Sequence, residues 1–195
     1  LDRGERLGIV GESGAGKSVT GFAIINLISK PGYISRGKIL FENQELNRLP
    51  EEKMRAIRGN RISMIFQDPM MTLNPVLSIA TQMTETVLAH QNVTKTDALD
   101  IALDKLKKVY IPSPEKRLQQ YPHECSGGMR QRIVIAIALL TNPALIIADE
   151  PTTALDVTIQ AQIVDLVQDL QQKMDTSVIW ITHDLGVVAG LADKV

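Results

Sequence analysis

The chain has 195 residues, of which 44% are hydrophobic and 22% are charged, and this composition is typical of a folded globular protein. Its 21 Lys and Arg residues against 22 Asp and Glu residues give a formal net charge of -1, without the basic excess that nucleic-acid-binding proteins normally show. A single cysteine, Cys125, excludes an intrachain disulfide. The longest apolar stretch, the eight residues 133–140, is too short to span a bilayer.

Apolar runs alternate with amphipathic segments in the first third of the chain. Residues 7–10 are predicted to form a buried strand that Gly11 ends, and residues 17–29 a helix that ends before Pro31 and Gly32. Residues 39–41 and 62–66 predict further strands.

The middle of the chain has a different pattern. From Val76 to about Gln120 the sequence shows helical patterns and loops but no convincing strand. We therefore expect a helical lobe inserted in an α/β core.

The last third returns to strands and helices. Residues 145–148 and 178–181 are predicted strands, and Asp156 is a candidate N-cap for the helix between them. Apolar residues recur at helical spacing in that helix, namely Ile159, Ile163, Leu166, Val167 and Leu170. Strands that alternate with helices predict a mostly parallel sheet covered on both faces.

A glycine-rich phosphate loop follows the first predicted strand. It reads Gly11-Glu12-Ser13-Gly14-Ala15-Gly16-Lys17-Ser18 and fits the pattern G-x-x-x-x-G-K-[ST]. Glycines let backbone N–H groups converge on a phosphate, and the helix N-terminus adds a favourable dipole. Lys17 is expected to reach the β- and γ-phosphates, and the Ser18 hydroxyl to bind Mg²⁺. The alternative is a glycine-rich turn that binds nothing.

Two carboxylates, Asp149 and Glu150, directly follow the predicted strand 145–148. In a parallel sheet, ligands gather at the carboxyl ends of strands, where the phosphate loop also lies. We expect Asp149 to hold Mg²⁺ through water, because Mg²⁺ keeps much of its hydration shell. Glu150 is then free to orient or deprotonate an attacking water. Without the phosphate loop, the pair would equally fit a cap for the next helix.

The remaining motifs occur in a fixed order. Gln67 follows the strand 62–66, and His183 follows the strand 178–181. Between them lie Ser126-Gly127-Gly128 and Ala154-Leu155-Asp156. In this order and spacing the chain resembles the ATPase subunits of ABC transporters, from Gly11 to His183.

The resemblance implies a P-loop NTPase (RecA-like) core with a mostly parallel sheet and an inserted α-helical subdomain. The core would comprise residues 1–67 and 130–195, and the helical subdomain, with the signature Ser126-Gly127-Gly128, about 68–129. The chain would be part of a longer polypeptide, without the family's first strands and C-terminal segment. No aromatic residue precedes Gly11, so the side chain that stacks on adenine in the family has no counterpart here.

The resemblance also implies roles for these residues. Such ATPase units pair head to tail, so the signature Ser126-Gly127-Gly128 would contact ATP bound to the partner's phosphate loop. Gln67 would touch Mg²⁺ or the attacking water, and His183 would bond the γ-phosphate. Asp156 would communicate across the dimer. Cys125 stands where relatives usually carry Leu or Phe, and we expect this small apolar thiol to pack in their place.

Several segments, residues 67–75, 121–124 and 147–158 among them, resemble the peptide and nickel importer branch, and residues 183–190 are most similar to its oligopeptide-import members. The implied function is ATP hydrolysis that powers peptide import at the cytoplasmic face of the cell membrane. The implied partners are two integral-membrane permeases, a second ATPase subunit (identical or paralogous) and an extracytoplasmic peptide-binding protein, with no nucleic acid. Alternatives are an importer for nickel or another small solute, a soluble ABC ATPase of DNA repair or translation, and a nucleotide-binding module without turnover.

Overall fold

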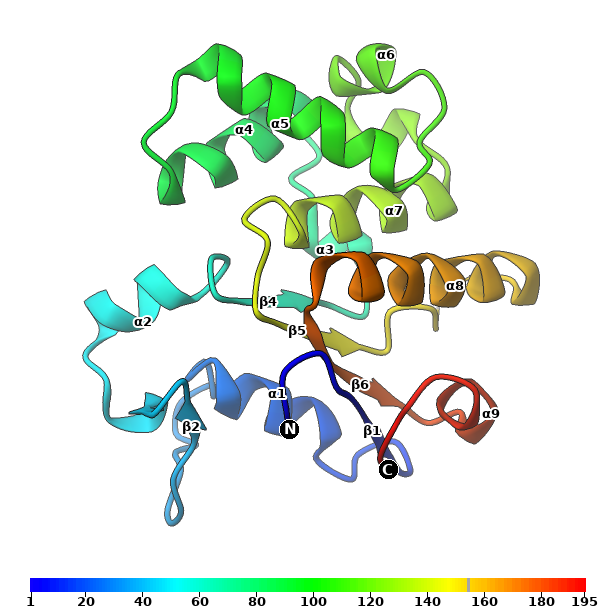
Figure 1. Cartoon of the computed structure of the whole chain (residues 1–195). Coiled ribbons are helices and arrows are strands. Elements are labelled where there is room, and N and C mark those ends of the chain that lie inside the picture. Colours follow the sequence, from blue (N-terminus) through cyan, green and yellow to red (C-terminus); the bar gives the residue numbers. More distant parts are fainter. Residues whose placement is uncertain (154) are drawn as a thin grey trace.

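The computed structural model describes residues 1–153 and 155–195, with the side chain of Met71 excepted. Its centre is a parallel four-stranded sheet in the order β1-β6-β5-β4 (Figure 1). The strands are β1 (Arg6–Val10), β4 (Ile62–Ile65), β5 (Leu145–Asp149) and β6 (Ser177–Thr182). The predicted parallel sheet is therefore confirmed, with strand ends that differ from the predictions by one residue.

The two faces of this sheet carry alternating side chains, because successive residues of a strand point to opposite faces. Trp180 belongs to the larger hydrophobic core, and its neighbours Ile179 and Ile181 belong to the smaller one. The helices α7 (Gly127–Ala138) and α8 (Val157–Met174) lie on one side of the sheet and α1 (Lys17–Ile24) on the other (Figure 1). This covering of both faces explains why the central strands are almost entirely apolar.

Helix α1 ends at Ile24, so the prediction of a helix over 17–29 is wrong in its extent. The backbone N–H of Asn26 donates to Ala23 O at 3.1 Å, and that of Leu27 donates to Phe22 O at 2.8 Å. Asn26 has a φ of 53°, and this combination is a Schellman motif with a left-handed residue just after the helix. The left-handed conformation of Asn26 therefore ends the helix well before Pro31.

The predicted strand 39–41 exists in part but lies outside the parallel sheet. The structure has β2 (Leu40–Phe41) paired antiparallel with β3 (Gln44–Glu45). Glu42 and Asn43 between them have φ of 47° and 64°, as a tight hairpin turn requires. A 3₁₀ turn (Leu46–Arg48) and α2 (Glu51–Ile57) follow, and neither was predicted.

The region from Val76 to Gln120 contains helices and no strand among the described residues, as predicted. It holds α4 (Ile79–His90), α5 (Lys95–Lys108) and α6 (Pro114–Leu118), after the short α3 (Pro69–Thr72) and before the 3₁₀ turn Pro122–Glu124. Helices α4, α5 and α6 gather at the end of the molecule away from α1, whereas α3 packs against α7 nearer the sheet (Figure 1). Helix α7 packs against both α5 and β4, and so joins this helical region to the sheet.

Ser126 and Asp156 are the N-caps of the two helices α7 and α8 beside the sheet. The hydroxyl of Ser126 accepts a 3.3 Å hydrogen bond from the Met129 N–H and so caps α7, which begins at Gly127. Oδ1 of Asp156 accepts a 3.0 Å hydrogen bond from the Ile159 N–H, which confirms the predicted N-cap of α8. Cys125, just before α7, is buried with 3% exposure, as expected for a thiol that packs as a small apolar side chain.

The last helix, α9 (Leu185–Ala189), packs against β6 and β1. None of the described helices is both long enough and apolar enough to cross a membrane. The domain boundaries predicted at residues 67 and 130 stay predictions.

Candidate functional site

A cavity of about 500 Å³ lies at the carboxyl ends of the parallel strands. The phosphate loop follows β1, Gln67 follows β4, Glu150 follows β5 and His183 follows β6. The cavity is lined by Ser13, Gly14, Gly16, Lys17, Ser18, Val19, Gln67, Glu150, Thr153 and His183. The parallel sheet thus brings motifs from the whole length of the chain to one place, as the position of ligand sites in such sheets predicts.

The phosphate loop has the backbone that its glycines permit. Gly14 and Gly16 have φ of 83° and 88°, and Gly16 is the residue from which α1 starts. The buried Lys17 side chain bends back over the loop, and its Nζ donates to the carbonyl oxygens of Gly11 and Glu12 at 2.8 Å each. The N–H of Ala15 also donates to Glu12 O, at 3.2 Å, which closes the loop.

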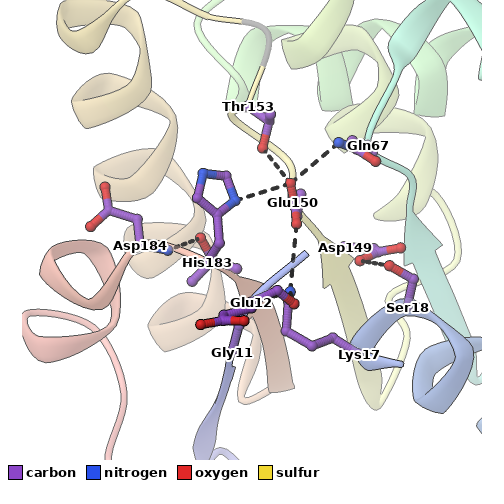
Figure 2. Close-up of polar contacts among 11 residues, drawn as sticks. Gly11, Glu12, Lys17, Ser18, Gln67, Asp149, Glu150, Thr153, His183 and Asp184 are labelled. Atoms are coloured by element: carbon purple, nitrogen blue, oxygen red, sulfur yellow. Dashed lines mark hydrogen bonds and ion pairs between the residues drawn. The ribbon is translucent and has the colours of Figure 1, made fainter. Parts of the chain in front are cut away.

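Ser18 and Asp149 contact each other at the edge of this cavity. The Ser18 hydroxyl donates to Oδ1 of Asp149 at 2.9 Å (Figure 2). Burial raises the pKa of the Asp149 carboxyl, and the hydrogen bond from Ser18 partly opposes that shift. A buried carboxylate beside a hydroxyl is a donor set that fits a hard divalent cation such as Mg²⁺.

Glu150 is the centre of the polar contacts in the cavity. Its Oε2 lies 3.2 Å from Nε2 of Gln67, 2.9 Å from Oγ1 of Thr153 and 3.3 Å from Nδ1 of His183 (Figure 2). Its Oε1 lies 4.0 Å from Nζ of Lys17. The side chain is 12% exposed, so this carboxylate is largely shielded but reaches the cavity.

The backbone of Glu150 has an unusual conformation for a glutamate. Its φ is 45°, in the left-handed region that side chains other than Gly, Asn and Asp seldom adopt. The Glu150 N–H donates to Ile181 O of β6 at 2.9 Å, which holds the residue in place at the end of β5. Strained backbone of this kind is concentrated at functional sites.

The other predicted site residues lie away from this cavity. Ser126, Gly127 and Gly128 form the start of α7 and are absent from the cavity lining described above. A Cβ on Gly128 would lie 3.1 Å from Cγ2 of Ile159, so the starts of α7 and α8 are close together. Asp156 caps α8, whereas Ala154 of the predicted Ala154-Leu155-Asp156 motif lies outside the described residues.

Thr153 is a site residue that we did not predict from the sequence. It stands three residues after Glu150, with Pro151 as the second residue of the turn. Proline favours that turn position, and the first and fourth residues of such a turn lie close together. The spacing Glu-Pro-x-Thr is the signal that could have identified Thr153.

Comparison with known proteins agrees with this geometry. Residues 1–153 match the model of the family described as "ABC transporter". The chain belongs to this ABC transporter family. It is 60% identical over 196 residues to "Oligopeptide transport ATP-binding protein OppD" of Bacillus subtilis, covering all of this chain and 55% of that protein. It is 57% identical to "Dipeptide transport ATP-binding protein DppD" of the same species, covering all of this chain and 58% of that protein.

The chain is also similar to a relative from a second species and to a solved structure. It is 51% identical to OppD of Escherichia coli, covering all of this chain and 58% of that protein, so the chain spans little more than half the length of these relatives. The fold matches the "Dimeric structure of a post-hydrolysis state of the ATP-binding cassette MJ0796 bound to ADP and Pi", with a TM-score of 0.83 and 29% identity. That match covers 96% of this chain and 78% of the other.

Proposed function

We propose that this chain binds and hydrolyses ATP and that hydrolysis powers peptide import by an ABC transporter. The observation that carries the proposal is the position of Glu150. Its carboxylate lies between the phosphate-loop lysine Lys17 on one side and Gln67 and His183 on the other. A carboxylate there is suited to accept a proton from a water that attacks the terminal phosphate of a bound nucleotide.

Nucleotide binding is supported by the phosphate loop. The backbone of Gly14 and Gly16 leaves N–H groups free of side-chain obstruction at the start of α1, where the helix dipole favours an anion. Lys17 Nζ donates to the carbonyls of Gly11 and Glu12 and can exchange them for phosphate oxygens.

Mg²⁺ would be held by Ser18 directly and by Asp149 through water, with Gln67 nearby. The metal would neutralise charge on the phosphates. This chain's own residues do the rest: Glu150 takes the proton from the water, Gln67 orients that water, and His183 bonds the γ-phosphate. Catalysis of phosphoryl transfer consists mainly of such positioning and charge stabilisation.

The signature residues are proposed to serve a second copy of the site. Ser126 and Gly128 lie at the N-terminus of a 12-residue helix, a position that favours an anion. They do not line the cavity of Lys17 and Glu150, and the structural relative bound to ADP and Pi is described as dimeric. We therefore infer a head-to-tail pair in which each nucleotide lies between one chain's phosphate loop and the other chain's signature, with Asp156 at the contact.

The transported substrate is proposed from the relatives. The similar proteins named above carry "oligopeptide transport" and "dipeptide transport" in their names. The partners would be two integral-membrane permeases, a second ATPase subunit and an extracytoplasmic peptide-binding protein, with this chain at the cytoplasmic face of the membrane. The helical region after Gln67 would contact the permeases, so that closing of the dimer is passed to them.

The test of the ATPase proposal is Glu150→Gln in the full-length protein. We expect ATP hydrolysis to fall by about 10²–10⁴-fold, because the variant loses its general base. ATP binding should persist, and the dimer should stay closed around the unhydrolysed nucleotide. Glu52→Gln, at an exposed position of α2, is the matched control and should hydrolyse ATP like the wild type. Unchanged turnover in Glu150→Gln would remove Glu150 from this role.

The import proposal needs a separate experiment. The tagged full-length protein is purified from detergent-solubilised membranes, and the chains that accompany it are identified by mass. We expect two multi-span permeases and a second ATPase. Ribosomal or DNA-repair proteins without a permease would contradict import and leave the ATPase chemistry in place.

A further inference from the structure

We propose that Thr153 is a positioning residue for hydrolysis, whose hydroxyl holds Oε2 of Glu150 and so leaves Oε1 facing the nucleotide. The inference deepens the proposed ATPase function and rests on it. It assigns a task to a side chain that lines the cavity between Glu150 and the start of α8.

The contact between Thr153 and Glu150 is built into one turn. The N–H of Thr153 donates to the Glu150 carbonyl oxygen at 3.3 Å, and its hydroxyl donates to Oε2 of Glu150 at 2.9 Å. Pro151 occupies the second position of this four-residue turn, where its fixed φ restricts the backbone. The turn therefore places the hydroxyl and the carboxylate within hydrogen-bond distance of each other.

The two oxygens of Glu150 have different surroundings. Oε2 has Gln67, Thr153 and His183 within 3.3 Å, whereas Oε1 has Lys17 Nζ at 4.0 Å (Figure 2). The first oxygen is thus saturated with contacts, and the second is directed toward the phosphate loop. A base in this orientation presents Oε1 to the place where the terminal phosphate would lie.

Thr153 differs from the other two partners of Oε2 in where it comes from. Gln67 follows β4 and His183 follows β6, and in the proposed reaction both turn to water, metal or γ-phosphate. Neither can then keep its full contact with Glu150. Thr153 belongs to the turn of Glu150 itself, so it is the partner of Oε2 that remains when nucleotide is bound.

The chemical step explains why this orientation matters. The water oxygen forms a bond to the γ-phosphorus while the bond from that phosphorus to the β–γ bridging oxygen breaks, and one water proton passes to Oε1 of Glu150. The products are ADP and inorganic phosphate. A carboxylate free to rotate would present a proton acceptor in the wrong direction for much of the time, and misplacement on this scale is costly in enzymes.

The experiment compares Thr153→Val with Thr153→Ser in the full-length protein purified with its membrane partners. Valine has nearly the shape of threonine but cannot donate, and Thr153 is exposed, so the fold should tolerate it. We expect kcat for ATP hydrolysis to fall about tenfold in Thr153→Val, the scale of a lost hydrogen bond to a charged group. KM for ATP should change by less than about twofold, because binding and transition-state positioning are separate. Thr153→Ser should restore most of kcat.

Two further variants make the result decisive. Thr152→Val removes the neighbouring hydroxyl, which makes no side-chain hydrogen bond to Glu150, and should behave like the wild type. Glu150→Gln, measured in the same assay, should be nearly inactive. If Glu150→Gln is inactive but Thr153→Val matches the wild type, or Thr153→Ser fails to restore kcat, the inference about Thr153 is wrong and the proposed function stands. If Glu150→Gln hydrolyses ATP normally, the proposed function is wrong, and the inference falls with it.

Discussion

Ser18 and Asp149 are 131 positions apart in the chain, and the hydroxyl of the first lies 2.9 Å from Oδ1 of the second. The contact joins the first turn of α1 to the last residue of β5. It places a hydroxyl and a buried carboxylate side by side in front of the phosphate loop, which is the arrangement from which we propose the magnesium site.

Asp149→Asn should weaken the response to magnesium. We expect the Mg²⁺ concentration for half-maximal ATP hydrolysis to rise by about ten- to hundredfold, the usual cost of losing a partner that supports a metal site. Nucleotide binding without Mg²⁺ should be unchanged. Asp165→Asn, at an exposed position of α8, is the control. A magnesium titration that is the same in all three proteins would contradict the site.

The same substitution should also stabilise the protein without ligand. Burial raises the pKa of the Asp149 carboxyl above its ordinary value of 3.8. The folded state therefore binds the proton more tightly than the unfolded state does. The free energy of unfolding consequently falls as the pH rises above the ordinary pKa of the carboxyl. At neutral pH Asp149→Asn removes that cost, so its Tm without nucleotide and Mg²⁺ should exceed that of the wild type. A lower Tm would show that the ionised carboxylate stabilises the fold.

Lys17→Ala should weaken nucleotide binding. The side chain is 7% exposed and its ammonium is directed into the phosphate loop, so its removal deletes a charged contact to the phosphates. We expect the Kd for ATP, measured by calorimetry, to rise about ten- to hundredfold, the range for a hydrogen bond to a charged group. Lys53→Ala, exposed on α2, should bind ATP as the wild type does. An unaltered affinity in Lys17→Ala would contradict the assignment of the loop.

Gly8→Ala should destabilise the fold. Gly8 lies in β1 beneath α9, and a Cβ at this position would lie 2.3 Å from Cγ1 of Val188 and 3.3 Å from Cβ of Ala192. We expect a loss of about 1–3 kcal/mol in the free energy of unfolding, as for other overpacked sites. Val188→Ala in the same chain should recover part of it, because the two residues share one contact. Gly190→Ala, whose Cβ would meet nothing within 4 Å, should have little effect in urea titrations.

The ion pair of Arg6 and Asp193 should give the fold a defined acid sensitivity. Arg6 donates to both carboxylate oxygens of Asp193, with Nη2 2.7 Å from Oδ1 and the backbone nitrogen 2.8 Å from Oδ2. The Arg6 guanidinium lowers the pKa of Asp193 from 3.8 to about 2. The contribution to stability is therefore present above the unfolded-state pKa and is lost as the pH falls through the folded-state value.

Asp193→Asn tests this window. The Tm difference between wild type and variant should be constant at neutral and mildly acidic pH and should shrink between about pH 4 and about pH 2. Asp165→Asn should show no such dependence. A difference that remains equally large at the lowest pH would mean that the ionised carboxylate is not what stabilises this contact.

Local sequence patterns were sufficient for the elements that build the site. The strand before Gly11 and the strand before Asp149 are short apolar runs bounded by breakers, and the rule that ligands gather at strand ends placed the two motifs together. The extent of α1 was predicted wrongly because Asn26 ends the helix by adopting a left-handed backbone conformation. In the sequence, an asparagine indicates a helix end less clearly than Pro31 does. The hairpin strand Leu40–Phe41 looked like a strand of the main sheet, since a short apolar run does not reveal its partner.

Tertiary geometry determined what the sequence patterns left open. The placement of β6 between β1 and β5 decides that His183 and Glu150 meet, and no local pattern contains that order. The same holds for the orientation of the Glu150 carboxylate, which depends on donors from three different places in the chain. The turn Glu-Pro-x-Thr could have predicted that Thr153 lies close to Glu150. It could not have predicted that the Thr153 hydroxyl bonds Oε2.

The two glycines of the signature, Gly127 and Gly128, have different surroundings. A Cβ on Gly128 would crowd Ile159 at 3.1 Å, whereas a Cβ on Gly127 would meet nothing within 4 Å. In a descendant of this chain that no longer bound nucleotide, any larger residue at 128 would still require Ile159 to shift by a few tenths of an ångström. The descendant would be free to lose the glycine at 127. Loss of nucleotide binding in such a descendant should therefore show more readily at position 127, because the packing of α7 against α8 also favours glycine at position 128.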